Sequence, residues 1–396
     1  MVDPNPVPRL LYVSNMVPAL PGGGEVMVYR HLKGLVDSGW NVTVSPPAAA
    51  IRPLPPGHGF EILPLPARRF WWPPSSNRLP LTQWLRAGLW YRSMRSNPSW
   101  ARPVPDCVLT VLWGHSSLTA LYLARFWGVP LAVWVHDLFR EMGLPARQER
   151  DGERLMRAVL READRVWTVS EELGSALDPL CRPGAVRPLA AVPERDSAPA
   201  GGWNPQFRPN PVIAHAGAFH PYHVGYLAAV AGAAEKRGGS LLVVTPSDNP
   251  ALAQLRATGI RFRHQSSFPS SAEALRFLAR EASALTIMYP LDPSDYAHPP
   301  LGFPSRLIEF SHLGLPILLA APPGNPLVNW ARRNDWPLVL EHADWGVLES
   351  LVQQLSQEGA WRSLSARMLA IADEACNPSK IHRQFSAELP RRKRPS

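Results

Sequence analysis

Short apolar runs alternate with helix-like stretches along nearly the whole chain, and this alternation constrains the fold more than any other feature. Buried strands are expected at 9–15, 41–45, 61–66, 106–112, 130–136 and 165–170. After a break the pattern restarts, with a helix from about 223 to 237 and strands at 212–217, 241–245, 260–264, 285–289, 316–320 and 337–341. Strands joined through helices favour mainly parallel sheets with right-handed crossovers. The sequence therefore predicts an α/β protein with two consecutive halves.

Chain length and a change of composition indicate where the two halves divide. The chain has 396 residues, which is too long for one ordinary hydrophobic core, and its 45% of hydrophobic residues are enough to form two cores. Proline, alanine, glycine and arginine dominate residues 181–211, apart from a possible short strand at 186–192. We place the interdomain linker there and expect one domain at 1–195 and a second at 196–376, before a basic C-terminal tail.

Charge and cysteine content narrow the classes of partner. The formal net charge is +9, which favours phosphorylated ligands, acidic lipid surfaces or nucleic acid. Only the charge suggests a nucleic-acid partner, and the sequence has no recognised nucleic-acid-binding motif, so we expect no such partner. Three widely spaced cysteines fit neither a disulfide framework nor a zinc site, and no apolar run is long enough to span a membrane. A cytoplasmic location is the simplest expectation.

The stretch from Pro304 to Leu319 combines features of a nucleotide site. Pro304 and Ser305 are expected to open a helix, with Ser305 as its cap, so that free amides and the positive dipole end face an anion. Glu309 lies one turn further and suits a ribose diol. Gly314 is expected at the C′ position that ends the helix. The alternative for Glu309 is a helix carboxylate in a local ion pair.

This segment resembles the donor-binding motif of glycosyltransferase family 4, whose members are retaining enzymes of the GT-B fold. The motif there reads Pro-Ser/Asn-Lys-x-x-Glu-[Tyr/Phe], followed by Gly-x-Pro and a strand. Here Arg306 replaces the lysine, and Leu301 stands where many members carry a first glutamate. The resemblance implies two Rossmann-like domains with mainly parallel sheets that face a central cleft. It also implies that a C-terminal helix within 377–396 crosses back to the N-terminal domain.

The resemblance continues in matching order over most of the chain and implies a set of donor-binding residues. Gly22 to Glu25 is similar to a Gly-Gly-x-Glu loop that approaches the donor diphosphate, although a glycine turn before a helix is often only a turn. In place of a Gly-Arg-x-x-x-x-Lys clamp, the chain has Ala218 and His223 at the two cationic positions, which leaves Arg306 and His223 as candidate cations. Phe268 is expected near the nucleobase. The implied donor-binding set is Gly22, Gly23, Gly24, Gly217, His223, Phe268, Gly302, Phe303, Pro304, Ser305, Arg306 and Glu309.

Two further segments follow neighbouring predicted strands of the first half. Trp113-Gly114-His115 follows the fourth strand and Trp134-Val135-His136-Asp137-Leu138 the fifth, at the edge where open α/β sheets bind ligands. Family members similarly place a His-Asp pair near the donor sugar. His136 is therefore the candidate that bonds a sugar hydroxyl, Asp137 the candidate that orients the acceptor hydroxyl, and His115 an acceptor-side residue. The alternatives are a packed histidine and a capping aspartate.

Residues 67–102 lie outside these motifs. They contain seven arginines, five tryptophans and no acidic residue. Arginine interleaved with tryptophan suits a membrane interface, and we predict that this segment binds an anionic membrane surface. The wall of an acceptor groove, or a packed helix with a basic face, remain alternatives.

The resemblance implies a retaining, hexosyltransferase-type enzyme that moves a sugar from a nucleotide-diphosphate sugar to an acceptor hydroxyl of a glycan, lipid-linked or polysaccharide precursor. No cofactor and no metal are expected, because the sequence has neither a Cys/His cluster nor an Asp-x-Asp. Within the expected cytoplasmic location, peripheral attachment to the inner face of the cell membrane is the preferred interpretation of residues 67–102. Two alternatives stay open: a sugar-nucleotide epimerase or hydrolase of the same fold, and an inactive binding protein, suggested by Leu301 and Ala218.

Overall fold

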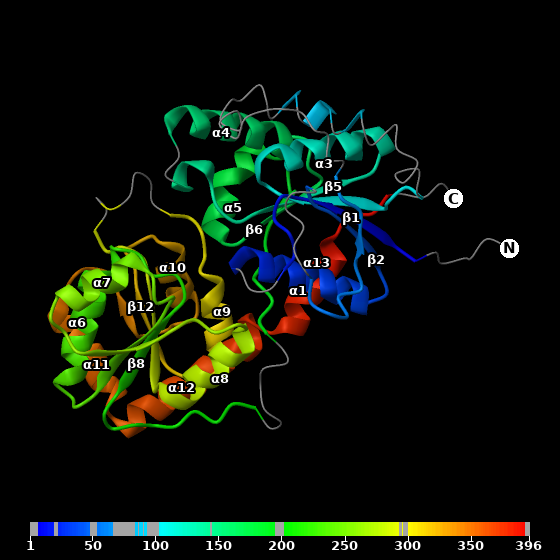
Figure 1. Cartoon of the computed structure of the whole chain (residues 1–396). Coiled ribbons are helices and arrows are strands. Elements are labelled where there is room, and N and C mark those ends of the chain that lie inside the picture. Colours follow the sequence, from blue (N-terminus) through cyan, green and yellow to red (C-terminus); the bar gives the residue numbers. More distant parts are fainter. Residues whose placement is uncertain are drawn as a thin grey trace. The chain divides into compact units, whose positions relative to one another are not determined.

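The protein divides into two compact units (Figure 1). The computed structural model describes residues 7–19, 23–47, 54–65, 84–85, 87–89, 91–92, 103–142, 145–194, 202–292, 295 and 300–392. The first unit comprises Met1–Ala190 and Ser379–Ser396, and the second comprises Ala191–Pro378. The division thus falls at Ala190, inside the stretch that the sequence analysis assigned to the linker.

The first unit is built on a parallel sheet with strand order β3-β2-β1-β4-β5-β6-β7. Its strands are β1 (Arg9–Val13), β2 (Asn41–Ser45), β3 (Glu61–Ile62), β4 (Cys107–Val111), β5 (Leu131–Val135), β6 (Arg165–Thr168) and β7 (Val186–Pro188). All residues of β4 and β5 are buried, as their unbroken apolar runs predict for central parallel strands. The strand β7 confirms the possible strand at 186–192, so part of the predicted linker belongs to this sheet.

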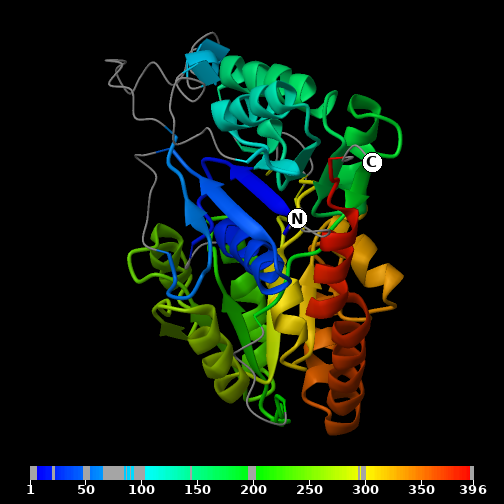
Figure 2. The ribbon, with the colours of Figure 1, turned by 90° about the vertical axis from the view of Figure 1, so that its right-hand side faces the viewer.

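Helices cover both faces of the first sheet. They are α1 (Gly23–Asp37), α3 (Gly114–Trp127), α4 (Ala146–Leu160), α5 (Glu171–Leu177) and α13 (Pro378–Glu388), with short 3₁₀ turns η4 (Phe139–Met142) and η5 (Asp178–Leu180). Helices α1 and α13 lie side by side on one face, and α3 and α4 lie on the other (Figures 1 and 2). The crossovers β1–β2, β4–β5, β5–β6 and β6–β7 run through α1, α3, α4 and α5, respectively.

The C-terminal helix α13 completes the core of the first unit. The fully buried ring of Phe385 packs 4.8 Å from the ring of Trp167 and 5.8 Å from that of Trp134. The Nε1 of Trp167 donates to Oε2 of Glu388 at 3.0 Å, and Nε2 of His382 lies 3.1 Å from Oγ of Ser38 in the turn after α1. Residues distant in sequence therefore close this core together.

Gly34 determines how closely α13 approaches α1. A Cβ at this position would lie 2.5 Å from Nδ1 of His382. We expect Gly34→Ala to destabilise the first unit by roughly 1–3 kcal/mol through overpacking, as measured by chemical denaturation. Gly232→Ala is the matched control, since a Cβ on that helical glycine meets nothing within 4 Å. The added mutation His382→Ala should relieve most of the loss, and no relief in the double mutant would contradict this account.

The second unit repeats the architecture with strand order β10-β9-β8-β11-β12-β13, again all parallel. Its strands are β8 (Val212–Ala216), β9 (Ser240–Val244), β10 (Phe262–Gln265), β11 (Ala284–Met288), β12 (Ile317–Ala320) and β13 (Val339–Leu340). Its helices are α6 (His223–Glu235), α7 (Pro250–Ala257), α8 (Ser271–Glu281), α9 (Ser305–Ser311), α10 (Pro326–Arg333), α11 (Trp345–Leu355) and α12 (Glu358–Ala375).

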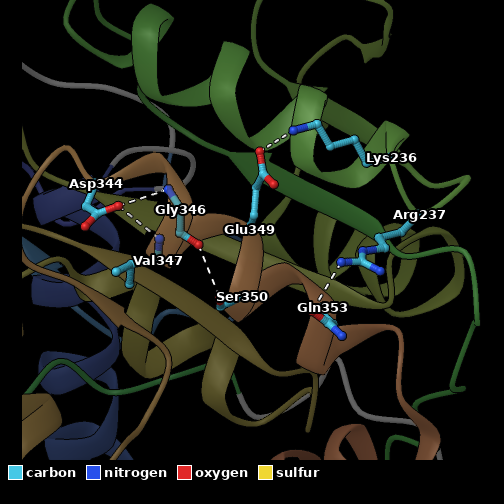
Figure 3. Close-up of polar contacts among 8 residues, drawn as sticks. All are labelled: Lys236, Arg237, Asp344, Gly346, Val347, Glu349, Ser350 and Gln353. Atoms are coloured by element: carbon cyan, nitrogen blue, oxygen red, sulfur yellow. Dashed lines mark hydrogen bonds and ion pairs between the residues drawn. The ribbon is translucent and has the colours of Figure 1, made fainter.

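Polar contacts at the surface link α11 to the end of α6 (Figure 3). Lys236 pairs with Glu349, and Nη2 of Arg237 donates to Oε1 of Gln353 at 3.2 Å. The Oδ1 of Asp344 caps α11 by accepting from the amides of Gly346 and Val347 at 2.9 and 3.1 Å. Because these pairs are exposed, we assign the anchoring of α11 to its buried leucines and treat the pairs as minor.

Helix α9 differs from its expected form at both ends. Pro304 is its N-cap, with φ −72° and ψ 107°, and no side chain caps the helix. Ser305 is therefore the first helical residue, and its predicted capping role is wrong. The helix ends at Ser311 with His312 as C-cap, so Gly314 follows C′ rather than occupying it. Its φ of +66° still reverses the chain toward β12.

Candidate functional site

The carboxyl edge of the first sheet brings together two of the predicted motifs. Strands β1, β4 and β5 are neighbours, so the residues that follow them share this edge. A Cβ on Gly24 would lie 3.0 Å from Nδ1 of His136 and 3.1 Å from Cε of Met16. Gly24 thus lies directly beside the predicted catalytic histidine, and the missing side chain is what permits this approach. Gly23 begins α1 with open space around it, while Gly22 lies outside the described residues.

The ring of His136 is neutral and lacks one hydrogen bond. Its Nε2 is buried and has no hydrogen-bond partner in the described part of the chain. Burial lowers the pKa of His136 to about 4, so the ring carries no charge at neutral pH. An unpaired buried polar group costs about 1–3 kcal/mol. A ligand hydroxyl that pairs with Nε2 recovers that free energy, which suits the predicted contact with a sugar.

Asp137 and His115 follow the same two neighbouring strands, β5 and β4, that place His136 at this edge. Asp137 is exposed at its surface, yet desolvation by the surrounding chain raises the pKa of its carboxyl group above its ordinary value. His115 is the second residue of α3, partly exposed, and its carbonyl accepts a hydrogen bond from Oγ1 of Thr119 at 3.0 Å. The roles of His115, His136 and Asp137 stay predictions, while their placement at adjacent strand ends is a property of the fold.

A serine that the sequence analysis missed ties two strand ends of the first unit together. The Oγ of Ser116 accepts from the amide of Asn15 at 3.2 Å and donates to the carbonyl of Trp113 at 2.8 Å. Gly114, with φ +59°, lies so close that a Cβ there would be 3.3 Å from Nδ2 of Asn15. Only the Gly after Trp113 signals this turn in the sequence, because a serine inside a helix start carries no specific pattern.

In the second unit, a guanidinium from helix α9 lies at the carboxyl end of strand β8. Nη1 of Arg306, in the first turn of α9, donates to the carbonyl of Ala216 at 2.9 Å. Gly217 has φ +108°, and a Cβ there would lie 3.0 Å from the same Nη1. Burial lowers the pKa of Arg306 below its ordinary value, but an arginine stays protonated in proteins. A fixed positive charge therefore stands at the turn where the sequence lacks the arginine of the clamp.

The histidines of this turn are neutral. His223 and His215 are both buried, with ring centroids 5.1 Å apart. Burial is the main cause that lowers the pKa of His223 to about 2, and electrostatic interactions with His215 and Arg306 lower it further. Its Nδ1 accepts the amide proton of His220 at 2.9 Å, so the ring organises the start of α6. The structure contradicts the interpretation of His223 as a second cation, because its buried site disfavours the charged form.

Glu309 and the residues before α9 have defined partners inside the second unit. Oε2 of Glu309 accepts from the amide of Glu194 at 3.1 Å. The hydroxyl of Tyr289, a residue that the sequence analysis did not select, donates to the buried carbonyl of Gly302 at 3.0 Å. The ring of Phe303 lies 6.4 Å from that of Trp330, at the margin of the core. These contacts fix the segment that leads into α9.

Phe268 follows β10 and is partly buried. Its ring lies 5.0 Å from that of Phe277 on α8 with a 44° angle between the planes. It packs against the margin of the core of the second unit. This environment leaves the expected contact with a nucleobase a prediction.

The predicted membrane segment lies mostly outside the described residues. Of residues 67–102, the structure describes 84–85, 87–89 and 91–92. Trp84 is exposed, and the ring of Tyr91 packs on Phe126 at 5.7 Å. Among the described helices, none combines the length and apolar character needed to cross a bilayer. The described side chains also contain no group of three or more His, Cys, Asp or Glu suited to a metal ion.

Comparison with known proteins supports the architecture. The structure matches the sucrose-phosphate synthase of Thermosynechococcus elongatus with 14% identity and a TM-score of 0.69, over 96% of this chain and 98% of the synthase chain. It matches HepE of Anabaena, in complex with UDP and glucose, over 97% and 99% with 12% identity and a TM-score of 0.67. WaaG, a glycosyltransferase involved in lipopolysaccharide biosynthesis, matches over 97% and 99% with 14% identity and a TM-score of 0.62. No curated protein matches the sequence.

Two parallel α/β sheets in separate units and the likeness to these structures define a GT-B fold, which confirms the predicted fold class. Residues 22–190 match the family described as glycosyl transferase 4-like domain. The matched residues all lie in the first unit, and the match confirms the predicted resemblance for that unit.

Proposed function

We propose that this protein is a glycosyltransferase that moves a sugar from a nucleotide-diphosphate sugar to an acceptor hydroxyl. The observation that carries the proposal is the hydrogen bond from Nη1 of Arg306 to the carbonyl of Ala216 beside Gly217. A departing nucleotide diphosphate develops negative charge, and a pre-positioned guanidinium stabilises that charge without reorganisation. In this chain Arg306 takes over the role of the missing clamp cations, and no metal is needed for it.

The two units supply different parts of the reaction. In the second unit, Arg306 neutralises the diphosphate and Glu309 holds the ribose, with Gly217 allowing the close approach of the phosphate. In the first unit, Nε2 of His136 pairs with a hydroxyl of the transferred sugar, and Asp137 orients the acceptor. The diphosphate oxygen that leaves the anomeric carbon accepts the proton of the attacking hydroxyl. Substitution on that face retains the anomeric configuration.

A binding screen tests this proposal most directly. UDP, GDP and ADP and their glucose or mannose conjugates are added to the whole protein in a thermal-shift assay, because a ligand that favours the native state raises the melting temperature. UDP-glucose is the first candidate, since HepE was solved with it. We expect one nucleotide class to stabilise the protein. No shift with any of these compounds, together with no binding by calorimetry, would overturn the proposal.

Two other functions remain candidates on specific observations. Leu301 and Ala218 replace residues of the family's donor motif, which favours a binding protein without transferase activity. A sugar-nucleotide epimerase or hydrolase would use the same donor site without an acceptor. Product analysis separates the three: transfer to an acceptor, a new sugar or free sugar from donor alone, or nucleotide binding with no product.

Glu309 provides a prediction on donor binding. We expect Glu309→Ala to weaken nucleotide-sugar binding by about 100-fold, since it removes hydrogen bonds to a charged acceptor that are worth about 1.5–3 kcal/mol each. Glu309→Gln keeps an oxygen that can accept from the amide of Glu194, so this variant tests the effect of removing the charge alone. Calorimetry with the nucleotide found in the screen gives the affinities. If Glu309→Ala melts lower but binds the nucleotide as the wild type does, Glu309 anchors only the segment at Glu194.

For location, we propose attachment to the inner face of the cell membrane through residues 67–102, with a lipid-linked or polysaccharide precursor as acceptor. The seven arginines and five tryptophans of that segment support this proposal. Sedimentation with vesicles that contain an anionic lipid, compared with vesicles of phosphatidylcholine alone, tests it. Equal sedimentation with both would contradict an electrostatic attachment.

A further inference from the structure

Trp113 is an exposed aromatic residue that the protein holds in one position. It follows β4 and is 43% exposed, and its ring stacks on that of Phe139 with centroids 6.3 Å apart and 24° between the planes. Phe139 itself is buried. We call this pair, the open indole of Trp113 backed by Phe139, the Trp113 platform.

Hydrogen bonds on both sides fix the backbone beneath the platform. The amide of Trp113 donates to Oγ of Ser117 at 2.8 Å, and its carbonyl accepts from Oγ of Ser116 at 2.8 Å. Gly114 follows in the left-handed region with φ +59°. The position of the indole is therefore set before any ligand binds, which lowers the entropy cost of binding.

The backing ring is fixed equally tightly. Phe139 packs directly on α4 at Gly152, where an added Cβ would lie 2.4 Å from Cγ of the phenyl ring. Only a glycine at this point of α4 allows the approach. An exposed tryptophan on such a rigid support keeps apolar surface in contact with water, which is unfavourable, and it does not stabilise the core. This arrangement is typical of binding surfaces.

The surroundings of the platform decide which partner fits. Leu112, just before Trp113, donates its amide to the carbonyl of Trp134 at 2.8 Å, two residues before His136. Asp137, an exposed residue, lies two residues before Phe139, which begins η4. An aromatic face beside hydrogen-bonding groups matches a pyranose, which has an apolar C–H face and a rim of hydroxyls. A carboxylate at this place disfavours insertion into an anionic membrane.

We propose that the Trp113 platform is an acceptor subsite that stacks on the apolar face of a pyranose ring. This inference rests on the proposed glycosyltransferase function and specifies its acceptor as a carbohydrate at the position next to the reacting hydroxyl. The indole contributes contact area and orientation, while Asp137 pairs with a hydroxyl at the rim.

Saturation-transfer NMR on the full-length protein tests the proposal with the methyl glycosides of glucose, galactose, mannose and N-acetylglucosamine as probes. We expect at least one glycoside to receive saturation on the protons of one ring face. Trp113→Ala should weaken that binding roughly 10- to 100-fold, and Trp113→Phe should retain part of it. Trp345→Ala is the matched control, because Trp345 is 42% exposed in the second unit. It should leave the signal unchanged.

Nucleotide binding, measured on the same samples, separates this inference from the proposed function. Nucleotide binding without any glycoside signal, or with equal signals in wild type and Trp113→Ala, overturns the platform and leaves the donor site standing. If Trp113→Ala loses glycoside binding and the wild-type protein binds no nucleotide, the result supports the platform and contradicts the proposed transferase function. Vesicle binding that depends on Trp113, in place of glycoside binding, would identify a lipid partner and overturn the proposal.

Discussion

Arg306→Gln is expected to lower kcat/KM for sugar transfer by roughly 100- to 1,000-fold, the loss seen when one pre-positioned charge stabiliser is removed. Glutamine is polar and uncharged, and its side chain ends two bonds short of Nη1, so the change removes the charge together with the hydrogen bond to the carbonyl of Ala216 observed at 2.9 Å. The loss should appear mainly in kcat if Arg306 acts on the leaving diphosphate. Steady-state rates with the donor found by the binding screen measure it.

Two variants control for effects unrelated to the diphosphate. Arg367→Gln alters another arginine of the second unit that donates to a backbone carbonyl, that of Asn334 at 3.2 Å, and should leave the rate unchanged. Arg306→Lys retains a positive charge without the planar fork and should recover part of the rate. Wild-type kinetics and nucleotide affinity in Arg306→Gln would show that the guanidinium only supports the turn at Gly217, and another cation would then have to serve the diphosphate.

The sequence predicted the two sheets better than it predicted the contacts of the site. Central strands such as β4 and β5 are unbroken apolar runs, and their burial on both faces follows from that pattern. The edge strand β3 is two residues long, whereas the expected run was 61–66. A short edge strand gains less from burial, so the sequence pattern constrains its ends weakly.

The contacts that define the candidate site depend on residues far apart in the chain. Arg306 and Ala216 are separated by 90 positions, and Glu309 and Glu194 by 115. Periodicity places each residue on its own element but does not say which carbonyl or amide it meets. The sequence marked Arg306 as a candidate cation, and only the fold shows where its guanidinium lies. The neutral state of His223 likewise depends on burial that tertiary packing creates.

Acid sensitivity is the second large effect that the structure predicts. Three fully or nearly fully buried histidines are held neutral: burial is the main cause that lowers the pKa of His31 and His215 to about 3 and that of His223 to about 2. The ordinary value is 6.5, so the unfolded chain takes up protons first as the pH falls. The neutral histidines therefore make their full contribution to the free energy of unfolding at pH values above 6.5. Below that pH, the free energy of unfolding decreases by about 1.4 kcal/mol per pH unit for each histidine.

For the second unit, which contains His215 and His223, we expect a loss of roughly 3 kcal/mol between pH 7.5 and 5.5, followed by chemical denaturation at a series of pH values. His223→Asn should remove about half of this dependence, because asparagine can accept the amide of His220 but does not titrate. Tyr222→Phe, whose ring lies 4.5 Å from that of His223, is the matched control and should keep the full dependence. An unchanged pH slope in His223→Asn would mean that the ring gains its proton in the folded state and is free to act as a cation beside Arg306.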